Sequence, residues 1–244
     1  MGDEHARLVE VIKNSDNIVF FGGAGVSTES GIPDFRSADG IYNMKYAYPP
    51  ETILSHSFFI QNTNEFYIFY RDKLLYPDAR PNKAHLALAE LERRGKLKAI
   101  VTQNVDGLHM EAGSVNVMEL HGSCSRYYCI DCGRSFSADI LHDQAGIPHC
   151  PCGGIIKPDV VLFEEALDQH IIEKSVQAIR SADVLIVGGT SLNVYPAAGL
   201  IQYYNGDKLV LINKSATSYD RYASLVIRDS IGETLGAAVA SIDA

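Results

Sequence analysis

Four cysteines stand in two close pairs in the middle of the chain. Cys129 and Cys132 have two residues between them, residues 133–149 separate the two pairs, and Cys150 and Cys152 have one residue between them. Two such pairs of thiolates are typical ligands of a tetrahedral zinc ion, and four of them leave no coordination position open for a substrate. The spacing therefore predicts a structural zinc site, with unbound buried thiols as the alternative.

The fifth cysteine, Cys124, lies outside the two pairs. An odd number of cysteines in one short region is not a disulfide framework, and it favours metal binding in a reducing compartment. We expect Cys124 to be a buried free thiol. His149 is a less favoured substitute for one of the four ligands.

A second group of polar residues follows two apolar segments. Gln103, Asn104 and Asp106 come after residues 99–101, and His121 comes after residues 117–120. Singly, an Asn-x-Asp loop is more often a turn and a lone histidine is more often structural. At the carboxyl edge of an open α/β sheet, however, an amide, a carboxylate and an imidazole can orient a carboxamide and supply a general base.

A glycine-rich turn follows the first apolar segment, residues 18–21. Gly22, Gly23 and Gly25 permit a sharp turn and a close ligand, and the amides after them could bind a pyrophosphate. Thr28 stands where the dinucleotide fingerprint has its third glycine. The turn predicts a nucleotide site that departs from this fingerprint, with a plain strand-to-helix turn as the alternative.

The surrounding pattern indicates the elements that position these residues. Apolar segments without alternation are typical of strands buried on both faces in a mostly parallel sheet, so we predict an α/β fold. The expected strands are 18–21, 99–101, 117–120, 184–187 and 209–212, and the expected helices are 4–14, 82–94, 168–181 and 197–204. The aromatic-rich residues 40–81 predict a helical module that packs its aromatic side chains.

Charge and hydropathy exclude several classes of function. The chain of 244 residues has 21 basic and 30 acidic residues, a net charge of −9, which opposes binding to nucleic acid or to an anionic membrane and favours a basic partner. No apolar run approaches the roughly 18 residues that span a bilayer. The acidic start of the chain is unlike a secretory signal, so we expect a cytoplasmic protein. Nothing in the sequence predicts an oligomer.

Taken in order, these motifs resemble the sirtuin family of NAD-dependent protein deacylases, in its bacterial or archaeal type. The resemblance rests on residues 23–27, 31–37, 102–109, 121–122, the four paired cysteines, 189–192 and 195–198. It implies a Rossmann-like NAD-binding domain of residues 1–37, 82–122 and 159–244. It also implies a smaller domain formed by the helical module 38–81 and a zinc-binding module 123–158, with the active site between the two domains.

The resemblance further implies a role for individual residues. His121 is the general base, and Asn104 is the second catalytic residue. The implied peptide-binding residues are Val160, Val161, Leu162 and Phe163. The implied NAD-binding residues are Gly23, Ala24, Gly25, Ile32, Asp34, Phe35, Arg36, Gln103, Asn104, Asp106, Gly189, Thr190, Ser191 and Asn213.

The implied activity is NAD-dependent deacetylation of lysine in proteins or peptides, which yields nicotinamide and O-acetyl-ADP-ribose. NAD is then a cosubstrate and zinc is structural. A protein ADP-ribosyltransferase on the same scaffold and a deacylase for longer acyl groups are the alternatives. A nicotinamide dehydrogenase is disfavoured by the missing third glycine, and a nucleic-acid-binding zinc module by the acidic net charge.

Two departures from the family pattern concern the substrate. Glu164 replaces the usual glycine between Phe163 and Glu165, which could alter the backbone or add negative charge beside a basic peptide. The family members that remove dicarboxylic acyl groups use a Tyr-x-x-Arg pair, whereas Tyr67 is followed at that spacing by Tyr70. Short apolar acyl groups such as acetyl are therefore expected.

Overall fold

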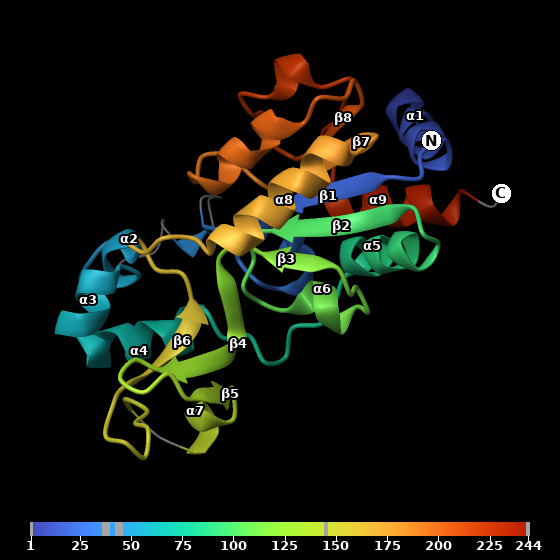
Figure 1. The fold of residues 1–244 in the computed structure, drawn as a ribbon. Helices are drawn as coiled ribbons and strands as arrows, with labels where there is room; N and C mark the ends of the chain where they lie inside the picture. The colour runs from blue at the N-terminus through green and yellow to red at the C-terminus, as the bar shows by residue number, and fades with distance from the viewer. Residues whose placement is uncertain (1, 36–39, 42–45, 144–145, 243–244) are drawn as a thin grey trace.

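A six-stranded parallel sheet forms the centre of the larger part of the protein. The structure, a computed structural model, describes residues 2–35, 40–41, 46–143 and 146–242 (Figure 1). The strand order is β3-β2-β1-β7-β8-β9, and every pair is parallel. The strands are β1 (Ile18–Gly22), β2 (Leu97–Thr102), β3 (Val117–Glu119), β7 (Val184–Gly188), β8 (Leu209–Ile212) and β9 (Leu225–Ile227). The predicted parallel α/β sheet is confirmed, while β9 was not predicted.

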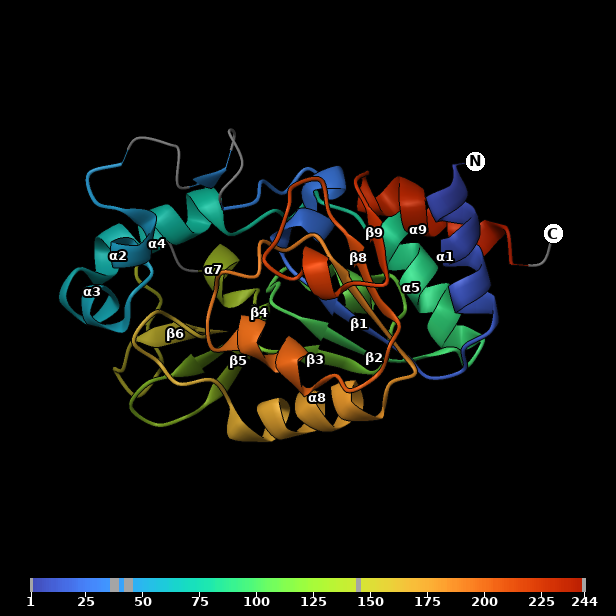
Figure 2. The same cartoon turned by 90° about the horizontal axis from the view of Figure 1, so that it is seen from above.

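Helices cover both faces of this sheet (Figure 2). Alternate β1 residues point to opposite faces, so Ile18 and Phe20 pack with α1, α5 and α9, whereas Val19 and Phe21 pack with α8 and η4. The covering helices are α1 (Asp3–Lys13), α5 (Lys83–Arg93), α8 (Gln169–Ser181), α9 (Ile231–Ala240) and the 3₁₀ helix η4 (Ala197–Tyr203). Burial on both faces explains why these strands are apolar throughout. Helix α9 was not predicted.

Short helical segments occupy several loops. They are η1 (Ala24–Val26) and η2 (Thr28–Ser30) after β1, α6 (Leu108–Glu111) after β2, and η5 (Asp220–Tyr222) before β9. Over the residues that the structure describes, no helix is long and apolar enough to cross a membrane.

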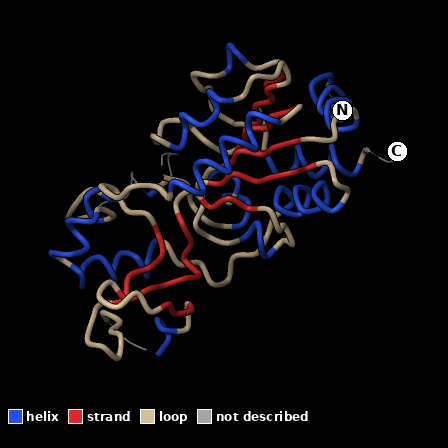
Figure 3. The backbone as a smooth tube through the Cα atoms, viewed as in Figure 1, coloured by secondary structure: helices blue, strands red, loops and turns tan. Residues whose placement is uncertain are grey.

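A second, antiparallel sheet lies to one side of the first (Figure 3). Its strands β4 (Gly122–Cys129), β5 (Ser135–Ser137) and β6 (Ile156–Val160) have the order β5-β4-β6. Helices α2 (Pro50–Ile53), α3 (His56–Gln61), α4 (Thr63–Lys73) and α7 (Ile140–Asp143) accompany it. Aromatic side chains of α3 and α4 share a buried core with Tyr127 of β4, which agrees with the predicted aromatic packing.

The chain passes from the parallel to the antiparallel sheet at residues 120–122. Gly122 has a φ of +75°, and a Cβ atom there would lie 1.9 Å from the carbonyl oxygen of Asp159. Only glycine accepts both the left-handed backbone and this contact. Arg126 of β4 adds hydrogen bonds of 2.7 Å to Glu119 and 2.9 Å to Asp159. These contacts fix the path of the backbone from one sheet to the other, and this path places His121 between the two sheets.

Helix α4 allows a matched test of the aromatic core. Phe66 is fully buried and packs edge to face against Phe59 at 4.9 Å between ring centroids, whereas Ile68 is 63% exposed on the same helix. Because truncating a buried aromatic leaves a cavity, Phe66→Ala should lower the free energy of unfolding by about 3–5 kcal/mol. Ile68→Ala should change it by less than about 0.5 kcal/mol. Chemical denaturation followed by circular dichroism measures both, and equal effects would contradict the packing described here.

Candidate functional site

The glycine turn after β1 packs directly on the turn after β7. The amide of Gly25 donates a 2.8 Å hydrogen bond to the carbonyl of Gly189. A Cβ atom on Gly25 would lie 2.8 Å from the backbone of Gly189, and one on Gly23 would lie 2.8 Å from the Cβ of Thr190. Gly189 itself has a left-handed φ of +59°. The glycines thus allow two strand-end turns to touch, and Ala24, between them, is half-buried.

Three polar side chains meet beside this turn, although they come from two loops. Ser27 donates a 2.6 Å hydrogen bond to Asp106, and Asn104 donates a 3.0 Å hydrogen bond to the Ser27 hydroxyl. The other Asp106 oxygen accepts from the amide of Leu108 at 3.0 Å. The carboxylate and the buried carboxamide are therefore held in fixed orientations. Ser27 was not among the predicted site residues, although it directly follows the glycine turn.

His121 lies at the transition between the sheets and is bonded to the loop after β2. Its Nδ1 is 3.0 Å from the carbonyl oxygen of Gln103. Because a carbonyl can only accept, Nδ1 carries the proton and Nε2 holds the lone pair in the neutral ring. Burial lowers the pKa of His121 below its usual value of 6.5, and the hydrogen bond to Gln103 opposes this shift. At neutral pH the imidazole is an uncharged potential base.

The ends of strands β2, β7 and β8 are joined by side chains. Gln103 donates a 3.1 Å hydrogen bond to the Thr190 hydroxyl, and Asn213 donates one of 3.1 Å to the Thr190 carbonyl. The Thr190 hydroxyl also accepts from the amide of Leu192 at 3.2 Å. Ser191, next in the chain, is half-buried. Predicted residues from three strands are thus brought together at one edge of the sheet.

The segment after η2 carries the remaining predicted cofactor residues. The amide of Ile32 donates to the carbonyl of Ser27 at 3.3 Å, and the carbonyl of Asp34 accepts from the amide of Ile41 at 2.9 Å. Phe35 packs against the aromatic core of the helical module. Arg36, also predicted, lies outside the described residues.

The predicted peptide-binding residues run from the end of β6 toward α3. Strand β6 ends at Val160, so Val161 and Leu162 lie beyond the strand rather than within it. The amide of Val161 donates a 2.9 Å hydrogen bond to the carbonyl of His121. Phe163 is 42% exposed. This segment therefore borders His121 and presents apolar surface.

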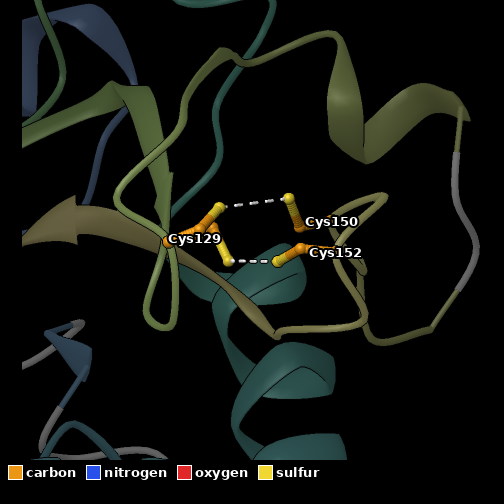
Figure 4. A group of neighbouring side chains, drawn as sticks. Cys129, Cys150 and Cys152 are labelled. Atoms are coloured by element: carbon orange, nitrogen blue, oxygen red, sulfur yellow. Dashed lines mark hydrogen bonds between the residues drawn. The ribbon is translucent and has the colours of Figure 1, made fainter.

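The four paired cysteines converge in the loops beside β4 and β6 (Figure 4). Their sulfur atoms all lie within 4.8 Å of one another, with 3.5 Å between Cys129 and Cys152 and 3.7 Å between Cys132 and Cys150. Zinc–sulfur bonds of about 2.3 Å in a tetrahedron require edges of about 3.8 Å. A Cβ atom on Gly154 would lie 2.7 Å from the Cys129 sulfur, so glycine leaves the room that the site needs. The donor set and its spacing suit structural zinc.

Cys124 is separate from this cluster and is buried, as expected. Its sulfur lies 3.8 Å from the carbonyl oxygen of Leu74. Burial raises the pKa of the Cys124 thiol to about 12, so the group stays protonated and is unsuited to metal binding.

Tyr67 and Tyr70 are packed inside the helical module. Both rings are fully buried, the Tyr67 hydroxyl donates to the carbonyl of Ile156, and the Tyr70 hydroxyl lies 3.0 Å from that of Tyr127. Arg71 lies over the Tyr67 ring at 5.2 Å from its centroid. These tyrosines thus stabilise the core of the helical module.

Two buried histidines lie beneath the Asp106 loop and were not predicted. His85 and His109 pack edge to face at 4.8 Å between ring centroids. Burial lowers the pKa of His85 to about 4 and that of His109 to about 3, although the charge of Asp106 opposes the shift for His85. The His85 Nδ1 accepts from the amide of Asn82 at 3.2 Å, so its proton is on Nε2. Both rings are neutral at physiological pH.

Comparison with known proteins places these features in a family. The family model described as "Sir2 family" matches residues 23–196. The chain is 61% identical to an NAD-dependent protein deacetylase of Clostridium acetobutylicum, covering 96% of this chain and 97% of the relative. It is 60% identical to a protein of the same name from Clostridium perfringens, covering 97% and 98%.

Solved structures give the same result. A structure described as bearing on the mechanism and regulation of Sir2 enzymes has a TM-score of 0.91 at 39% identity, covering 100% of this chain and 99% of the other. A complex of Sir2 with a p53 peptide and NAD⁺ has a TM-score of 0.84 at 36% identity, covering 94% of each chain. A Sir2 variant with a deacetylated p53 peptide and 3′-O-acetyl ADP-ribose has a TM-score of 0.87 at 36% identity, covering 95% and 96%.

The metal site can be tested with two cysteine variants. Cys150→Ala should lose stoichiometric zinc and unfold the loops around the cluster, because three thiolates bind zinc more weakly and the binding energy, on the order of 10 kcal/mol, is folding energy. Cys124→Ala should keep one zinc ion per chain, since its thiol lies outside the cluster. Metal analysis of purified protein measures both. Zinc retained by the Cys150 variant, or lost from the Cys124 variant, would refute the assigned ligand set.

Proposed function

The chain belongs to the Sir2 family and is an NAD-dependent protein deacetylase, and we propose how its own residues divide this work. NAD supplies the electrophilic ribose carbon from which nicotinamide departs, and the acetyl group ends on ADP-ribose. The substrates are acetyl-lysine-bearing peptides or proteins. The observation that carries the assignment of roles is the neutral, oriented imidazole of His121, bonded to the carbonyl of Gln103 in the same loop that carries Asn104 and Asp106.

His121 would act as the general base. Its Nδ1 proton is committed to the Gln103 carbonyl, so the basic nitrogen is Nε2. A lowered pKa keeps this nitrogen unprotonated at neutral pH, ready to accept a proton from a ribose hydroxyl. Gln103 thus contacts His121 through its carbonyl and Thr190, on the proposed cofactor side, through its side chain.

Asp106 and Asn104 would hold the nicotinamide carboxamide, together with Ile32. Asp106 already accepts from Ser27 and from the Leu108 amide, yet a carboxylate offers about four lone-pair positions, so it can accept an amide N–H as well. Ser27 links the two side chains and fixes their spacing. Preorganised groups of this kind lower the entropy that binding costs.

The strand-end turns would hold the rest of NAD. Gly23, Ala24, Gly25 and Gly189 bring backbone close to the phosphates, and Thr190, Ser191 and Asn213 would serve the phosphate and adenosine end. Asp34 and Phe35, with Arg36, would cover the reactive ribose and exclude water. The hydrogen bonds that join the ends of β2, β7 and β8 support this placement of NAD, because they bring these residues together at one edge of the sheet.

Several broader statements stay proposals. We propose that residues 1–37, 82–122 and 159–244 form the NAD-binding domain, and that 38–81 and 123–158 form the small domain; the grouping of the strands into two sheets over the described residues supports this division. A cytoplasmic location is supported by thiolates that require a reducing compartment. Direct contact with nucleic acid or membrane is disfavoured by the acidic net charge. No oligomer is proposed.

An ADP-ribosyltransferase remains the second candidate, since attack by another nucleophile at the same ribose carbon would modify a protein. Mass spectrometry of products from NAD and an acetylated peptide separates the two activities. Deacetylated peptide with O-acetyl-ADP-ribose supports the proposal, and ADP-ribosylated peptide supports transfer. A succinylated peptide in the same assay tests the acyl preference, since Tyr70 stands where the dicarboxylic-acyl subgroup has arginine and both tyrosine hydroxyls are already hydrogen-bonded within the core. Comparable turnover of both peptides would refute that preference.

Replacing His121 tests the general base directly. His121→Ala should slow deacetylation by about 10²- to 10⁴-fold, the usual contribution of general-base catalysis. The affinity for NAD should stay within about twofold, because the Ser27, Asn104 and Asp106 cluster is intact, and calorimetry measures it. His170→Ala, at an exposed position on α8, is the control and should match the wild type. Substantial turnover by the His121 variant would disprove the assignment.

The pH dependence of kcat/KM offers a second test. The base acts only when unprotonated, and burial lowers its pKa, so activity should persist as the pH falls to 6.5 and decline only below that value. The decline of kcat/KM at low pH should disappear in His121→Ala, because its residual activity does not depend on this base. Circular dichroism at each pH distinguishes activity lost by protonation of the base from activity lost by unfolding. An acid limb centred above 6.5 would contradict the neutral imidazole described here.

A further inference from the structure

Glu164 has an unusual backbone conformation for a residue with a side chain. Its φ is +74°, and among the described residues only Leu192 is another non-glycine with positive φ. The left-handed region is unfavourable for residues with a Cβ, and it persists only where the surroundings compensate. The family pattern described above has glycine at this position, and glycine would adopt this conformation without the cost that a Cβ adds.

The Glu164 side chain supplies the compensating contacts. One carboxylate oxygen accepts from the amide of Ser57 at 2.9 Å, and the other accepts from the Ser57 hydroxyl at 3.0 Å. Ser57 is in the first turn of α3, where amides have no partner within the helix. The N-cap residue Ser55 satisfies the Phe58 amide, which leaves those of His56 and Ser57 to be satisfied from outside.

The segment of Glu164 satisfies both of these amides. The amide of His56 donates to the carbonyl of Phe163 at 2.9 Å, and the amide of Phe163 donates to the carbonyl of Leu54 at 2.9 Å. Glu165 adds a 2.9 Å contact to the His56 ring. Residues 163–165 are thus bonded to residues 54–57, a contact that we name the 54–57/163–165 clamp.

The other end of the same segment is bonded to the proposed base. The amide of Val161 donates to the carbonyl of His121, so the segment 161–165 extends from His121 to the start of α3. Val161 and Phe163 are also among the residues that the family resemblance implies bind the peptide. A shift of α3 against this segment would therefore move the peptide-binding surface relative to the base.

We propose that Glu164 is a positioning residue for the peptide substrate, acting through the 54–57/163–165 clamp. The proposal rests on the proposed function, together with the family resemblance, which implies that Val160, Val161, Leu162 and Phe163 bind the peptide. Glu164 would act by geometry, because both of its carboxylate oxygens accept hydrogen bonds from Ser57 and so hold the segment of Phe163 against the start of α3.

Three substitutions of Glu164 separate geometry from charge. Glu164→Gln keeps an acceptor for the Ser57 amide and can exchange a hydrogen bond with its hydroxyl, but it loses the charge. Glu164→Ala loses both hydrogen bonds and keeps a Cβ in the left-handed region. Glu164→Gly loses both hydrogen bonds without backbone strain. Glu51→Ala, at an exposed acidic position on α2, is the control for loss of nearby charge.

Steady-state kinetics would use two acetylated peptides, one with basic and one with neutral flanking residues. Glu164→Ala should raise the KM of both peptides by about tenfold, the scale expected for two lost hydrogen bonds. Glu164→Gly should raise both by several-fold, and Glu164→Gln and Glu51→Ala should stay within about twofold of the wild type. The KM for NAD and kcat at saturating peptide should change by less than about twofold in every variant.

Other outcomes would overturn the proposal. A higher KM in Glu164→Gln for the basic peptide alone would show that Glu164 selects by charge. Wild-type KM in Glu164→Gly would show that the hydrogen bonds do not position the peptide. If Glu164→Ala misfolds, by circular dichroism and zinc content, the Gly and Gln variants still decide. Failure of the proposed function would be recognised separately, because the wild-type protein would then not deacetylate either peptide.

Discussion

The close contact between the backbones of Gly25 and Gly189 is the constraint on which the site depends. Strands β1 and β7 are neighbours in the sheet, and their turns can meet only because neither residue has a side chain at the contact. With the two turns together, Thr190 comes within hydrogen-bonding reach of Gln103, which follows β2 on the far side of β1, and of Asn213, which follows the neighbouring β8. One backbone contact thus gathers residues that are far apart in the sequence. The missing third glycine of the dinucleotide fingerprint is no defect in such a turn, because Ser27 and Thr28 follow in short 3₁₀ segments instead of a long helix.

Several of the strands that sequence patterns predicted are buried along their whole length. Strands β1, β7 and β8 are buried at every residue, so their apolar runs are unambiguous. Strand β9 has only three residues, too few to show a pattern of apolar residues. Helix α9 is rich in Ala and Gly and has few polar residues, so its sequence shows no clear helical periodicity. The pairing of β4 with β6 joins segments separated by the zinc loops, and such long-range antiparallel register depends on tertiary contacts that local patterns do not contain. The helix predicted at 197–204 is a 3₁₀ helix, a distinction that apolar spacing does not make.

The residues of the candidate site likewise divide into those that the sequence predicted and those that became apparent only in the structure. The cysteine spacing predicted the metal cluster because zinc geometry restricts ligand spacing strongly. Ser27 was missed because a serine after a glycine turn is common, and its role depends on hydrogen bonds to Asn104 and Asp106 that only the fold creates. His85 and His109 were missed because nothing local distinguishes a buried neutral histidine from an exposed one. Glu164 was noticed as a residue that could alter the backbone or add negative charge, but its hydrogen bonds to Ser57 are created only by the fold.

The antiparallel sheet connects the metal cluster with the base through one pair of strands. At one end of the β4–β6 pair, Gly122 pairs with Val160, next to His121 and to the start of the proposed peptide segment. At the other end, Cys129 pairs with Ile156, beside the second cysteine pair. Because a small sheet of three strands buries little surface of its own, metal binding supplies stability that its core would lack. A structural zinc ion that never contacts substrate can therefore still influence where His121 and residues 160–163 lie, since both ends belong to the same strand pair, whose register shifts between Gly122 and Tyr127.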